Sequence, residues 1–490
     1  HVGRMRRRFG LGADDRVLQF AALAFDASVE QIFPALTCGA SLVLPEHGLV
    51  APDRLLTHLQ EHRVTVMEVV PAYLGELVAV LSGTGATAYD LGRLRLLVLG
   101  GDVVRPADIT WWHQHFPDMA VVNTYGPTEA TVSTTVFDVP AGVGDWDGGV
   151  PLGRAVGERC LYVLDAALRE VPVGAVGELF IGGPVLARGY VGRAGLTAER
   201  FVPDPFGAVP GGRLYRTGDL VRWRNDGQLA FCGRADDQVK VRGFRVETGE
   251  VEARLREHPG IEDAAVVVRQ DRLVAYLVGQ YGQGVPAGDE VRDWLGQRLP
   301  AYMVPALCVT VDQLPRTVGG KVDRSRLPDP GSHRPSLGRS FEAPRTPAEQ
   351  AVAEVWQEVL QLDRIGVHDN FFDLGGHSLL ATRAVIRLRA VFGVDVGVRT
   401  LFERPTVAGL ADAIEEQLIC QIAGMSAEDV ERALRDQDVV QDVEQVVQEQ
   451  DLVRDVEAEK AERALQAHAP ADDVDRASGE RDRVEKEQQA

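Results

Sequence analysis

One group in this sequence that could carry chemistry is a serine hydroxyl at a predicted helix N-terminus. Ser378 lies in DNFFDLGGHSLL, Asp369–Leu380, directly after two glycines and a histidine. The apolar residues that follow, including Val385 and Leu388, recur at helical spacing, which predicts that a helix begins at this serine. A plain N-cap is the alternative, because serine is a preferred residue there. A hydrolase nucleophile is not indicated, because no G-x-S-x-G elbow surrounds Ser378.

A second group of candidates lies in NTYGPTEAT, Asn123–Thr131. It follows the apolar run MAVV, so Tyr125, Thr128 and Glu129 are expected at the C-terminal end of a strand, where α/β sheets bind ligands. A ring for stacking, a hydroxyl for phosphate and a carboxylate for Mg²⁺ suit a nucleotide. The alternative is a polar turn at a helix start.

Three more stretches carry polar groups at positions suited to a nucleotide. Asp219 in YRTGDL is a turn-held carboxylate that can accept both hydroxyls of a ribose, although aspartate is common in turns. Lys321 in TVGGKVDRSRLP places a point charge on a mobile loop that can visit and leave a phosphate, and it is not part of a Walker loop. Residues 233–252, GRADDQVKVRGFRVETGEVE, alternate cations with β-branched residues and predict a solvated strand.

The elements that must position these groups follow from the apolar pattern. Residues 1 to about 150 alternate short apolar strands with helical segments, which predicts an α/β layer with a largely parallel sheet. Residues 150–232 have shorter strands with frequent Gly and Pro, as in an antiparallel or barrel-like subdomain. A compact α+β lobe, a Pro- and Ser-containing linker and a small helical bundle follow. The charged tail is interpreted as a solvated, partly disordered helix, with a docking coiled coil as the alternative.

Composition narrows the function classes. The formal net charge of −20 argues against a nucleic-acid partner. The five cysteines are far apart and form no C-x-x-C pair, as in a reduced cytosolic protein. No apolar run approaches the ~18 residues of a membrane span. The first residue is His1 rather than Met, so we expect the chain to be part of a longer protein.

Taken in order, these stretches resemble the adenylation domain of nonribosomal peptide synthetases, within the acyl-adenylate-forming superfamily. FDAS at Phe25–Ser28, GELFIGGPVLARGY at Gly177–Tyr190 and LPAYMVP at Leu299–Pro305 continue the resemblance. The segment around Ser378 resembles the attachment motif of peptidyl carrier domains. The resemblance implies an adenylation core over residues 1–232, a mobile lobe over 233–328, a linker over 329–344, a four-helix carrier bundle over 345–417 and an acidic tail over 418–490.

The resemblance also implies roles for single residues. Ser378 bears 4'-phosphopantetheine, Asp236 is the hinge of the mobile lobe, and Lys321 bridges carboxylate and phosphate oxygens during adenylation. Lobe rotation then withdraws Lys321 and admits the pantetheine thiol. The residues implied to hold ATP or AMP, with Glu129 also binding Mg²⁺, are Asn123, Tyr125, Gly126, Thr128, Glu129, Asp219, Arg234 and Lys321.

Two departures from the family pattern are visible. The Gly/Ser/Thr-rich phosphate loop expected several dozen residues before FDAS is absent, so we expect an amino-terminally truncated core whose own adenylation is weakened. Gly319 replaces the usual asparagine before Gly320, which loosens that loop.

The family sets amino-acid selectivity with pocket positions. Asp26 is expected to take the substrate ammonium, and Glu68 interrupts a buried apolar strand with no basic residue within four positions. A buried carboxylate needs a cation, so these residues predict a basic substrate such as lysine, β-lysine or ornithine. Glu30 has an alternative role in the first helical turn, where Ser28 and Gln31 form a possible capping box. The remaining pocket positions are Ala27, Val98, Gly100, Thr124, Val132 and Ser133, together with Lys321.

The sequence therefore predicts a cytoplasmic adenylation–carrier module of antibiotic or other secondary metabolism. It would use ATP and Mg²⁺ to activate an amino acid and load it on pantetheine. The expected partners are a phosphopantetheinyl transferase and condensation or other synthetase domains, docked through the tail, with no membrane partner. Two alternatives stay open: an aryl- or acyl-acid ligase of the same superfamily, and a carrier and docking protein with an inactive adenylation remnant.

Overall fold

The computed structural model describes residues 1–45, 51–141, 146, 149–207, 211–241, 243–269, 272–280, 284–317, 320–331, 334–335, 337, 339–394 and 396–423. The predicted acidic tail, from residue 424 on, and Gly319 lie outside the described residues. Two compact units divide the chain: the first comprises residues 1–388 and 395–412, and the second comprises residues 389–394 and those from 413 on. The expected segment boundaries at 232, 328, 344 and 417 stay predictions.

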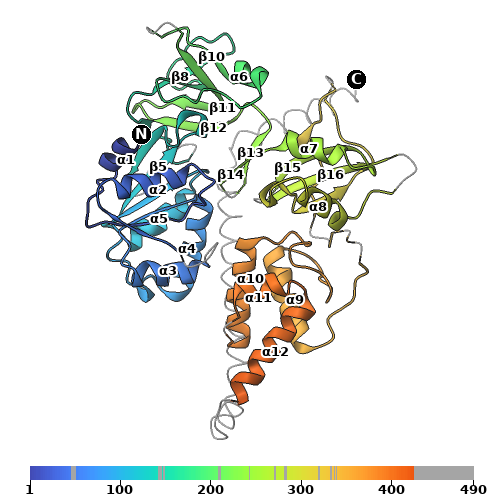
Figure 1. Cartoon of the computed structure of the whole chain (residues 1–490). Helices are drawn as coiled ribbons and strands as arrows, with labels where there is room; N and C mark the ends of the chain where they lie inside the picture. The colour runs from blue at the N-terminus through green and yellow to red at the C-terminus, as the bar shows by residue number, and fades with distance from the viewer. Residues whose placement is uncertain are drawn as a thin grey trace, which may run out of the picture. The chain divides into compact units, whose positions relative to one another are not determined.

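The amino-terminal part is an α/β layer, as predicted from its alternating apolar runs (Figure 1). Seven strands form one sheet in the order β2-β1-β3-β4-β5-β6-β7, in which β1 to β5 run parallel and β6 and β7 are antiparallel additions. The strands are β1 (Arg16–Leu18), β2 (Ser41–Val43), β3 (Val66–Val69), β4 (Leu96–Gly100), β5 (Ala120–Tyr125), β6 (Thr135–Val139) and β7 (Arg154–Ala155). The helices are α1 (Val2–Arg8), α2 (Ala27–Leu36), α3 (Pro52–Glu61), α4 (Pro71–Thr84) and α5 (Pro106–His115).

Both faces of the sheet are buried at β4, which explains why this strand, Leu96–Gly100, is apolar on both faces. In β4, Leu97 and Leu99 join one apolar cluster with Trp112 of α5, while Leu96 and Val98 join a second cluster on the opposite face. Successive side chains of a strand point to opposite faces, so this alternation follows from the pleat. The buried sheet holds the carboxyl ends of β3, β4 and β5 side by side.

The β-rich subdomain is antiparallel, as predicted. Its sheet has the order β10-β11-β9-β8. Strand β12 also pairs antiparallel with β11. Its elements are β8 (Cys160–Leu164), β9 (Gly177–Gly182), α6 (Ala194–Arg200), β10 (Phe201–Pro203), β11 (Arg213–Trp223) and β12 (Leu229–Arg234).

The following lobe mixes helices and strands, again as predicted. A two-stranded hairpin, β13 (Gln238–Val241) with β14 (Phe244–Glu247), precedes a three-stranded sheet of β15 (Ile261–Arg269), β16 (Arg272–Gly279) and β17 (Leu307–Thr310). Helices α7 (Thr248–Arg256) and α8 (Gly288–Gly296) belong to the same lobe, and a shared apolar cluster includes Val246, Leu255 and Leu295.

Four helices follow in the carrier segment: α9 (Pro347–Leu360), α10 (Ser378–Phe392), α11 (Val398–Glu403) and α12 (Val407–Ala423). Thr346 caps α9, since its hydroxyl accepts from the amide of Glu349 while the Glu349 carboxylate accepts from the amide of Thr346. The prediction that a helix begins at Ser378 is confirmed.

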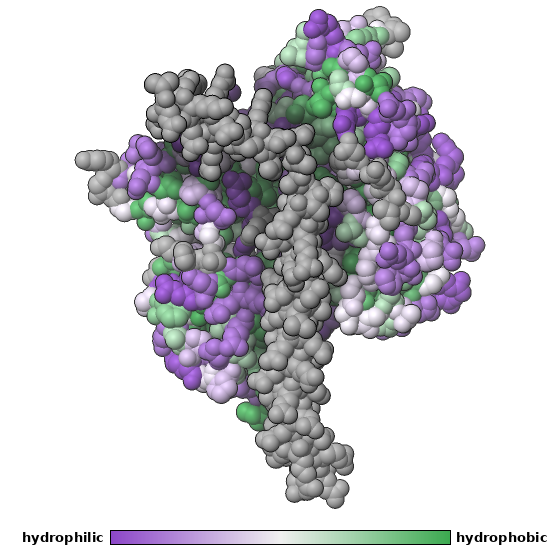
Figure 2. All heavy atoms as spheres, turned by 180° about the vertical axis from the view of Figure 1, so that it is seen from behind, coloured by the Kyte–Doolittle hydropathy of each residue, from purple (hydrophilic) through white to green (hydrophobic). Residues whose placement is uncertain are grey.

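Among the described residues, no helix combines the length and the apolar character needed to cross a bilayer. On the face shown in Figure 2, the coloured residues are mostly hydrophilic, with smaller apolar patches between them. This surface agrees with a sequence in which 25% of residues are charged.

Candidate active site

The carboxyl end of β5 presents two buried polar side chains. Asn123 donates from Nδ2 to the carbonyl of Pro151 at 2.8 Å, and its Oδ1 is buried without a hydrogen-bond partner among the described residues. Tyr125 donates its hydroxyl to Asp219 at 2.5 Å. A buried acceptor without a donor is costly, so Asn123 Oδ1 is suited to an amino group supplied by a ligand.

Asp219 is held by an irregularity in β11. The pairing of β11 with β9 shifts between Arg216 and Leu220, and the Thr217 hydroxyl there accepts from the amide of Asp219 at 3.0 Å. Gly218 has a φ of 78°, and a side chain at this position would overlap the Asp236 carboxylate. The glycine in YRTGDL is therefore required by both its backbone conformation and the close approach of Asp236.

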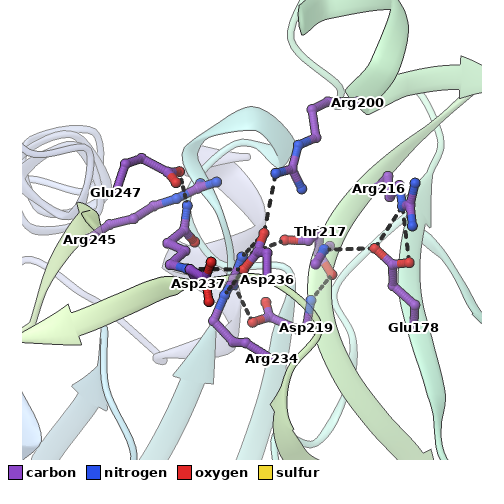
Figure 3. A network of polar contacts seen from close by, with 12 residues as sticks. Glu178, Arg200, Arg216, Thr217, Asp219, Arg234, Asp236, Asp237, Arg245 and Glu247 are labelled. Atoms are coloured by element: carbon purple, nitrogen blue, oxygen red, sulfur yellow. Dashed lines mark hydrogen bonds and ion pairs between the residues drawn. The ribbon is translucent and has the colours of Figure 1, made fainter. Parts of the chain in front are cut away.

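A chain of ion pairs continues from Asp219 (Figure 3). Arg234 donates to Asp219 at 2.5 Å and to both oxygens of Asp236 at 2.8 and 3.0 Å. Arg200 of α6 adds a contact to Asp236 at 3.2 Å. Burial acts to raise the pKa of Asp236, but the two guanidinium groups outweigh it and lower that pKa below its usual range. The predicted ribose and hinge residues thus form one network, which also includes Arg200, a residue that no sequence pattern had indicated.

Both carboxylate oxygens of Glu129 already accept hydrogen bonds. Tyr190 donates to Oε1 at 2.6 Å, and Arg245 of β14 donates to Oε2 at 2.8 Å. Arg245 also donates to the Tyr215 hydroxyl at 3.2 Å. Burial acts to raise the pKa of Glu129, but the Arg245 charge and the Tyr190 hydrogen bond lower it overall. The sequence patterns had identified Glu129 but none of its three neighbours as site residues.

The β13–β14 hairpin supplies further contacts to the strand ends. Lys240 lies over the Tyr125 ring, with Nζ 5.5 Å from the ring centre, and its burial lowers its pKa. The amide of Gly243 donates to Asp102 at 3.3 Å. The Phe244 ring lies 5.1 Å from that of Phe25. The prediction of a solvated strand over residues 233–252 is therefore wrong at Lys240, because tertiary packing holds that cation, half-buried, over an aromatic face.

Lys321 is exposed and lies in a turn of its own lobe. Its carbonyl accepts from the amide of Thr317 at 2.8 Å, and Arg316 donates to the carbonyl of Gly320 at 2.9 Å. No described contact joins its side chain to Asn123, Asp219 or Glu129. The structure thus has the β13–β14 hairpin, rather than Lys321, at the Glu129 carboxylate.

The loop after β5 makes a close turn. A side chain on Gly126 would overlap the carbonyl of Val132, and Thr131 and Val132 both have positive φ, at 62° and 57°. Thr128 is exposed, in the short 3₁₀ turn Thr128–Ala130. This turn directs Ser133 toward α2.

The predicted pocket positions on the strands and α2 are brought together. Ser133 donates to Glu30 from both its amide and its hydroxyl, each at 2.9 Å. Glu30 also contacts the His1 ring, and burial raises its pKa to about 7. Across the strands, Glu68 pairs with Val98, and the next strand pair sets Thr124 beside Gly100. A side chain on Gly100 would overlap the Thr124 hydroxyl.

Glu68 has an electrostatic environment dominated by other acids. Burial raises its pKa well above the usual range, and the charges of Glu30 and Asp26 raise it further, opposed by a hydrogen bond from Gln31. Among the described residues, no basic side chain contributes to this shift. The pocket therefore gathers three carboxylates whose mutual repulsion a ligand cation would relieve.

The prediction of a capping box formed by Ser28 and Gln31 is wrong. Helix α2 has Asp26 as its N-cap, without a side-chain cap bond, and the Ser28 hydroxyl donates to the carbonyl of Phe25 at 2.7 Å. Gln31 instead accepts from the amides of Phe20 and Ala21, both at 2.9 Å. Its side chain satisfies the loop after β1, a partner that local spacing does not reveal.

The loop before Ser378 is fixed by buried contacts. Asp369 accepts from the amide of Gly366 at 2.8 Å, and the Phe371 ring packs edge-on against Trp356 at 4.9 Å. A side chain on Gly376 would lie 2.3 Å from the Phe371 ring. The second glycine of the GGHS sequence is thus needed to pack Phe371 beneath the start of α10.

Comparisons with known proteins match both the part of the chain around Asn123 and Asp219 and the part around Ser378. Residues 1–191 match the family described as AMP-binding enzyme, and residues 250–321 match the AMP-binding enzyme C-terminal domain. Residues 350–414 match the phosphopantetheine attachment site. A component of the linear gramicidin synthase of Brevibacillus parabrevis is 45% identical over 439 residues, which are 88% of this chain and 5% of that protein. The chain belongs to the nonribosomal peptide synthetase family.

Two further relatives support this family assignment. Phosphinothricin tripeptide synthetase PhsC of Streptomyces viridochromogenes is 42% identical over 419 residues, 84% of this chain and 37% of that protein. A solved holo NRPS protein containing adenylation and PCP domains, bound to a vinylsulfonamide inhibitor, is 30% identical with a TM-score of 0.69. That likeness covers 83% of this chain and 66% of the solved one. The chain spans well under half the length of the two synthetases it matches.

The adenylation region has groups that fit the family's nucleotide. Asn123 Oδ1 offers a buried acceptor for an adenine amino group, and Asp219 stands beside Tyr125 at the strand end. Mg²⁺ commonly binds through one or two carboxylates together with substrate phosphates, and Glu129 offers one such carboxylate. Bound there, the cation would neutralise phosphate charge. Residues 350–414, which match the phosphopantetheine attachment site, include α10, whose first residue is Ser378.

Proposed function

We propose that this segment activates a basic amino acid with ATP as an aminoacyl adenylate and transfers it to phosphopantetheine on Ser378. The substrates in this proposal are lysine, β-lysine and ornithine. In this proposal Asn123, Tyr125 and Asp219 hold the nucleotide, and Asp26 takes the ammonium next to the reacting carboxylate. The second amino group of the substrate meets Glu68.

One observation carries the choice of a basic substrate: Glu68 is half-buried beside Glu30 and Asp26, and no basic side chain is among the groups that shift its pKa. A buried carboxylate is stabilised by an opposite charge within about 4–6 Å, which a basic substrate brings and an apolar acid does not. Glu30 is less available, because Ser133 donates to both of its oxygens. Glu68 is therefore the group that recognises the side chain, with Glu30 adding its charge behind it.

Two small residues, Gly100 and Thr124, lie side by side at the ends of β4 and β5. Gly100 leaves the end of β4 without a side chain, and the Thr124 hydroxyl donates to the carbonyl of Leu99 at 3.1 Å. That bond satisfies the only side-chain donor of Thr124. In this proposal the methylene chain of the substrate runs past these two small residues toward Glu68.

Binding of sulfamoyl adenosine conjugates, which are stable analogues of aminoacyl adenylates, tests this proposal directly. Isothermal titration of the chain should show lysyl and ornithyl conjugates binding at least ten times more tightly than the leucyl conjugate. Glu68→Gln should weaken the preference for lysine over leucine by about 1–3 kcal/mol, the effect of losing a charged partner. Glu61→Gln, an exposed acid at the end of α3, is the matched control and should change nothing.

Each of the alternatives has its own outcome in this titration. A leucyl or aryl conjugate that binds best would support an acyl- or aryl-acid ligase and refute the basic pocket. Failure of every conjugate to bind, with Ser378 still accepting pantetheine, would support a carrier with an inactive adenylation remnant.

A further inference from the structure

The β13–β14 hairpin brings a cation to the carboxylate that the proposed function assigns to Mg²⁺. Arg245 donates to Glu129 Oε2 at 2.8 Å, while Tyr190 donates to Oε1 at 2.6 Å. Arg245 also donates to Tyr215 at 3.2 Å, whose hydroxyl lies 3.4 Å from that of Tyr190. The four side chains form a closed ring in which each oxygen of Glu129 has a donor.

A carboxylate oxygen that accepts from a guanidinium is a poor ligand for a divalent cation at the same time. The two positive charges would lie a few ångströms apart, and at this separation like charges repel strongly in a partly buried site. Tyr190 occupies the other oxygen, so Glu129 cannot turn to offer a second free face. Arg245 and a metal ion therefore exclude one another at Glu129.

The rest of the hairpin makes this arrangement more than a chance contact of one long side chain. Lys240 lies over Tyr125, the amide of Gly243 donates to Asp102, and Phe244 packs against Phe25. Gly243 itself comes so close to Val70 that a side chain there would overlap it. Arg245 thus reaches Glu129 from a hairpin that several independent contacts hold at the strand ends.

We propose that Arg245 is a positioning residue that replaces the divalent cation at Glu129, so that the hairpin occupies the site only when the metal is gone. This inference rests on the proposed function, since it takes Glu129 as the metal-binding carboxylate. It orders the two half-reactions. Adenylation would require Glu129 free of Arg245, and Glu129 without a metal would be available to Arg245. The ion pair then stabilises the arrangement in which Lys321 stays in its own lobe.

Binding of Mn²⁺, followed by electron paramagnetic resonance in the presence of saturating α,β-methylene ATP, tests the inference without relying on catalysis. Arg245→Gln removes the competing charge, so the affinity for Mn²⁺ should rise by about fivefold or more, the lower end of typical coupling between two sites. Arg245→Lys keeps the charge without the guanidinium fork, so its Mn²⁺ affinity should lie between those of the native chain and of Arg245→Gln. Arg254→Gln, which removes an exposed arginine of α7 paired with Glu257, is the matched control and should leave the affinity unchanged.

The outcomes separate the inference from the function on which it rests. An unchanged or weaker Mn²⁺ affinity in Arg245→Gln, with the nucleotide analogue bound, would overturn the competition and leave the nucleotide site standing. Failure of the analogue to bind either protein would overturn both. A second readout is the lobe itself: Mn²⁺ and the analogue should increase hydrogen exchange of residues 238–247 in the native chain, and unchanged exchange would also contradict the inference.

Discussion

Replacement of Glu30 by glutamine gives a stability change whose sign reverses with pH. Burial raises the pKa of Glu30 from 4.5 to about 7, although the Ser133 donors and the Arg159 charge oppose this. Between these two pH values the folded chain binds more protons than the unfolded chain. The free energy of unfolding contributed by this group therefore falls as the pH rises from about 4.5 to about 7, and is flat outside that window.

The magnitude follows from the size of the shift. One pKa unit corresponds to about 1.4 kcal/mol, so ionising Glu30 in the fold costs about 3 kcal/mol by pH 8. Glutamine carries no charge but offers Ser133 one acceptor oxygen in place of two, which loses about 1 kcal/mol of hydrogen bonding. Glu30→Gln should therefore be about 1 kcal/mol less stable than the native chain below pH 4, about equally stable at pH 5, and about 2 kcal/mol more stable at pH 8.

Urea unfolding followed by tryptophan fluorescence at pH 5, 6, 7 and 8 measures this difference, because Trp112 is fully buried in the core of the same sheet. Glu61→Gln is the control, since this exposed acid of the same domain should give a difference that does not vary with pH. A difference between Glu30→Gln and the native chain that stays constant from pH 5 to pH 8 would refute the argument from burial.

Three further predictions concern the carrier region and Lys321. Ser378→Ala should abolish phosphopantetheinylation and leave adenylate binding unchanged, and a transferase that still adds pantetheine to the alanine variant would disprove the attachment site. Lys321→Ala should slow acyl-adenylate formation by about 10²–10³-fold, the loss for one charge-stabilising donor. In the same variant, the rate of transfer from supplied acyl adenylate should change little. Equal losses of rate in both half-reactions would contradict lobe rotation. Gly376→Ala should destabilise the carrier region by about 1–3 kcal/mol through overlap with Phe371, as thermal unfolding would report. Gly397→Ala has its nearest neighbour atom at 3.7 Å and should be nearly neutral; similar losses in both variants would contradict this packing argument.

The layers of the fold could be predicted because they follow from local patterns. The apolar runs around Met67, Leu97 and Val121 became parallel strands, and the Gly-rich stretch from 150 to 232 became an antiparallel sheet. Ser378 at the start of α10 followed from helical spacing. In each case the signal lies within about fifteen residues, where periodicity and turn chemistry decide the element.

The rest of the site depends on contacts between distant segments. Arg245 meets Glu129 and Arg200 meets Asp236 only because separate parts of the chain fold together. Gln31 was interpreted as a helix cap, but it binds backbone amides ten and eleven residues earlier. Local spacing cannot distinguish such partners from solvent, so cations such as Lys240 were assigned to an exposed strand by default. The only sequence signal for the position of Lys240 is that it alternates with valines.

The most direct test of the central claim is mass spectrometry of the peptide that contains Ser378. The chain is first treated with a phosphopantetheinyl transferase and coenzyme A, then with ATP, Mg²⁺ and an equimolar mixture of lysine, ornithine, leucine and phenylalanine. The account predicts a pantetheine adduct on Ser378 that carries a lysyl or ornithyl thioester, and no such thioester without ATP. Pantetheine that stays unloaded, or that carries leucine or phenylalanine in preference, would contradict it.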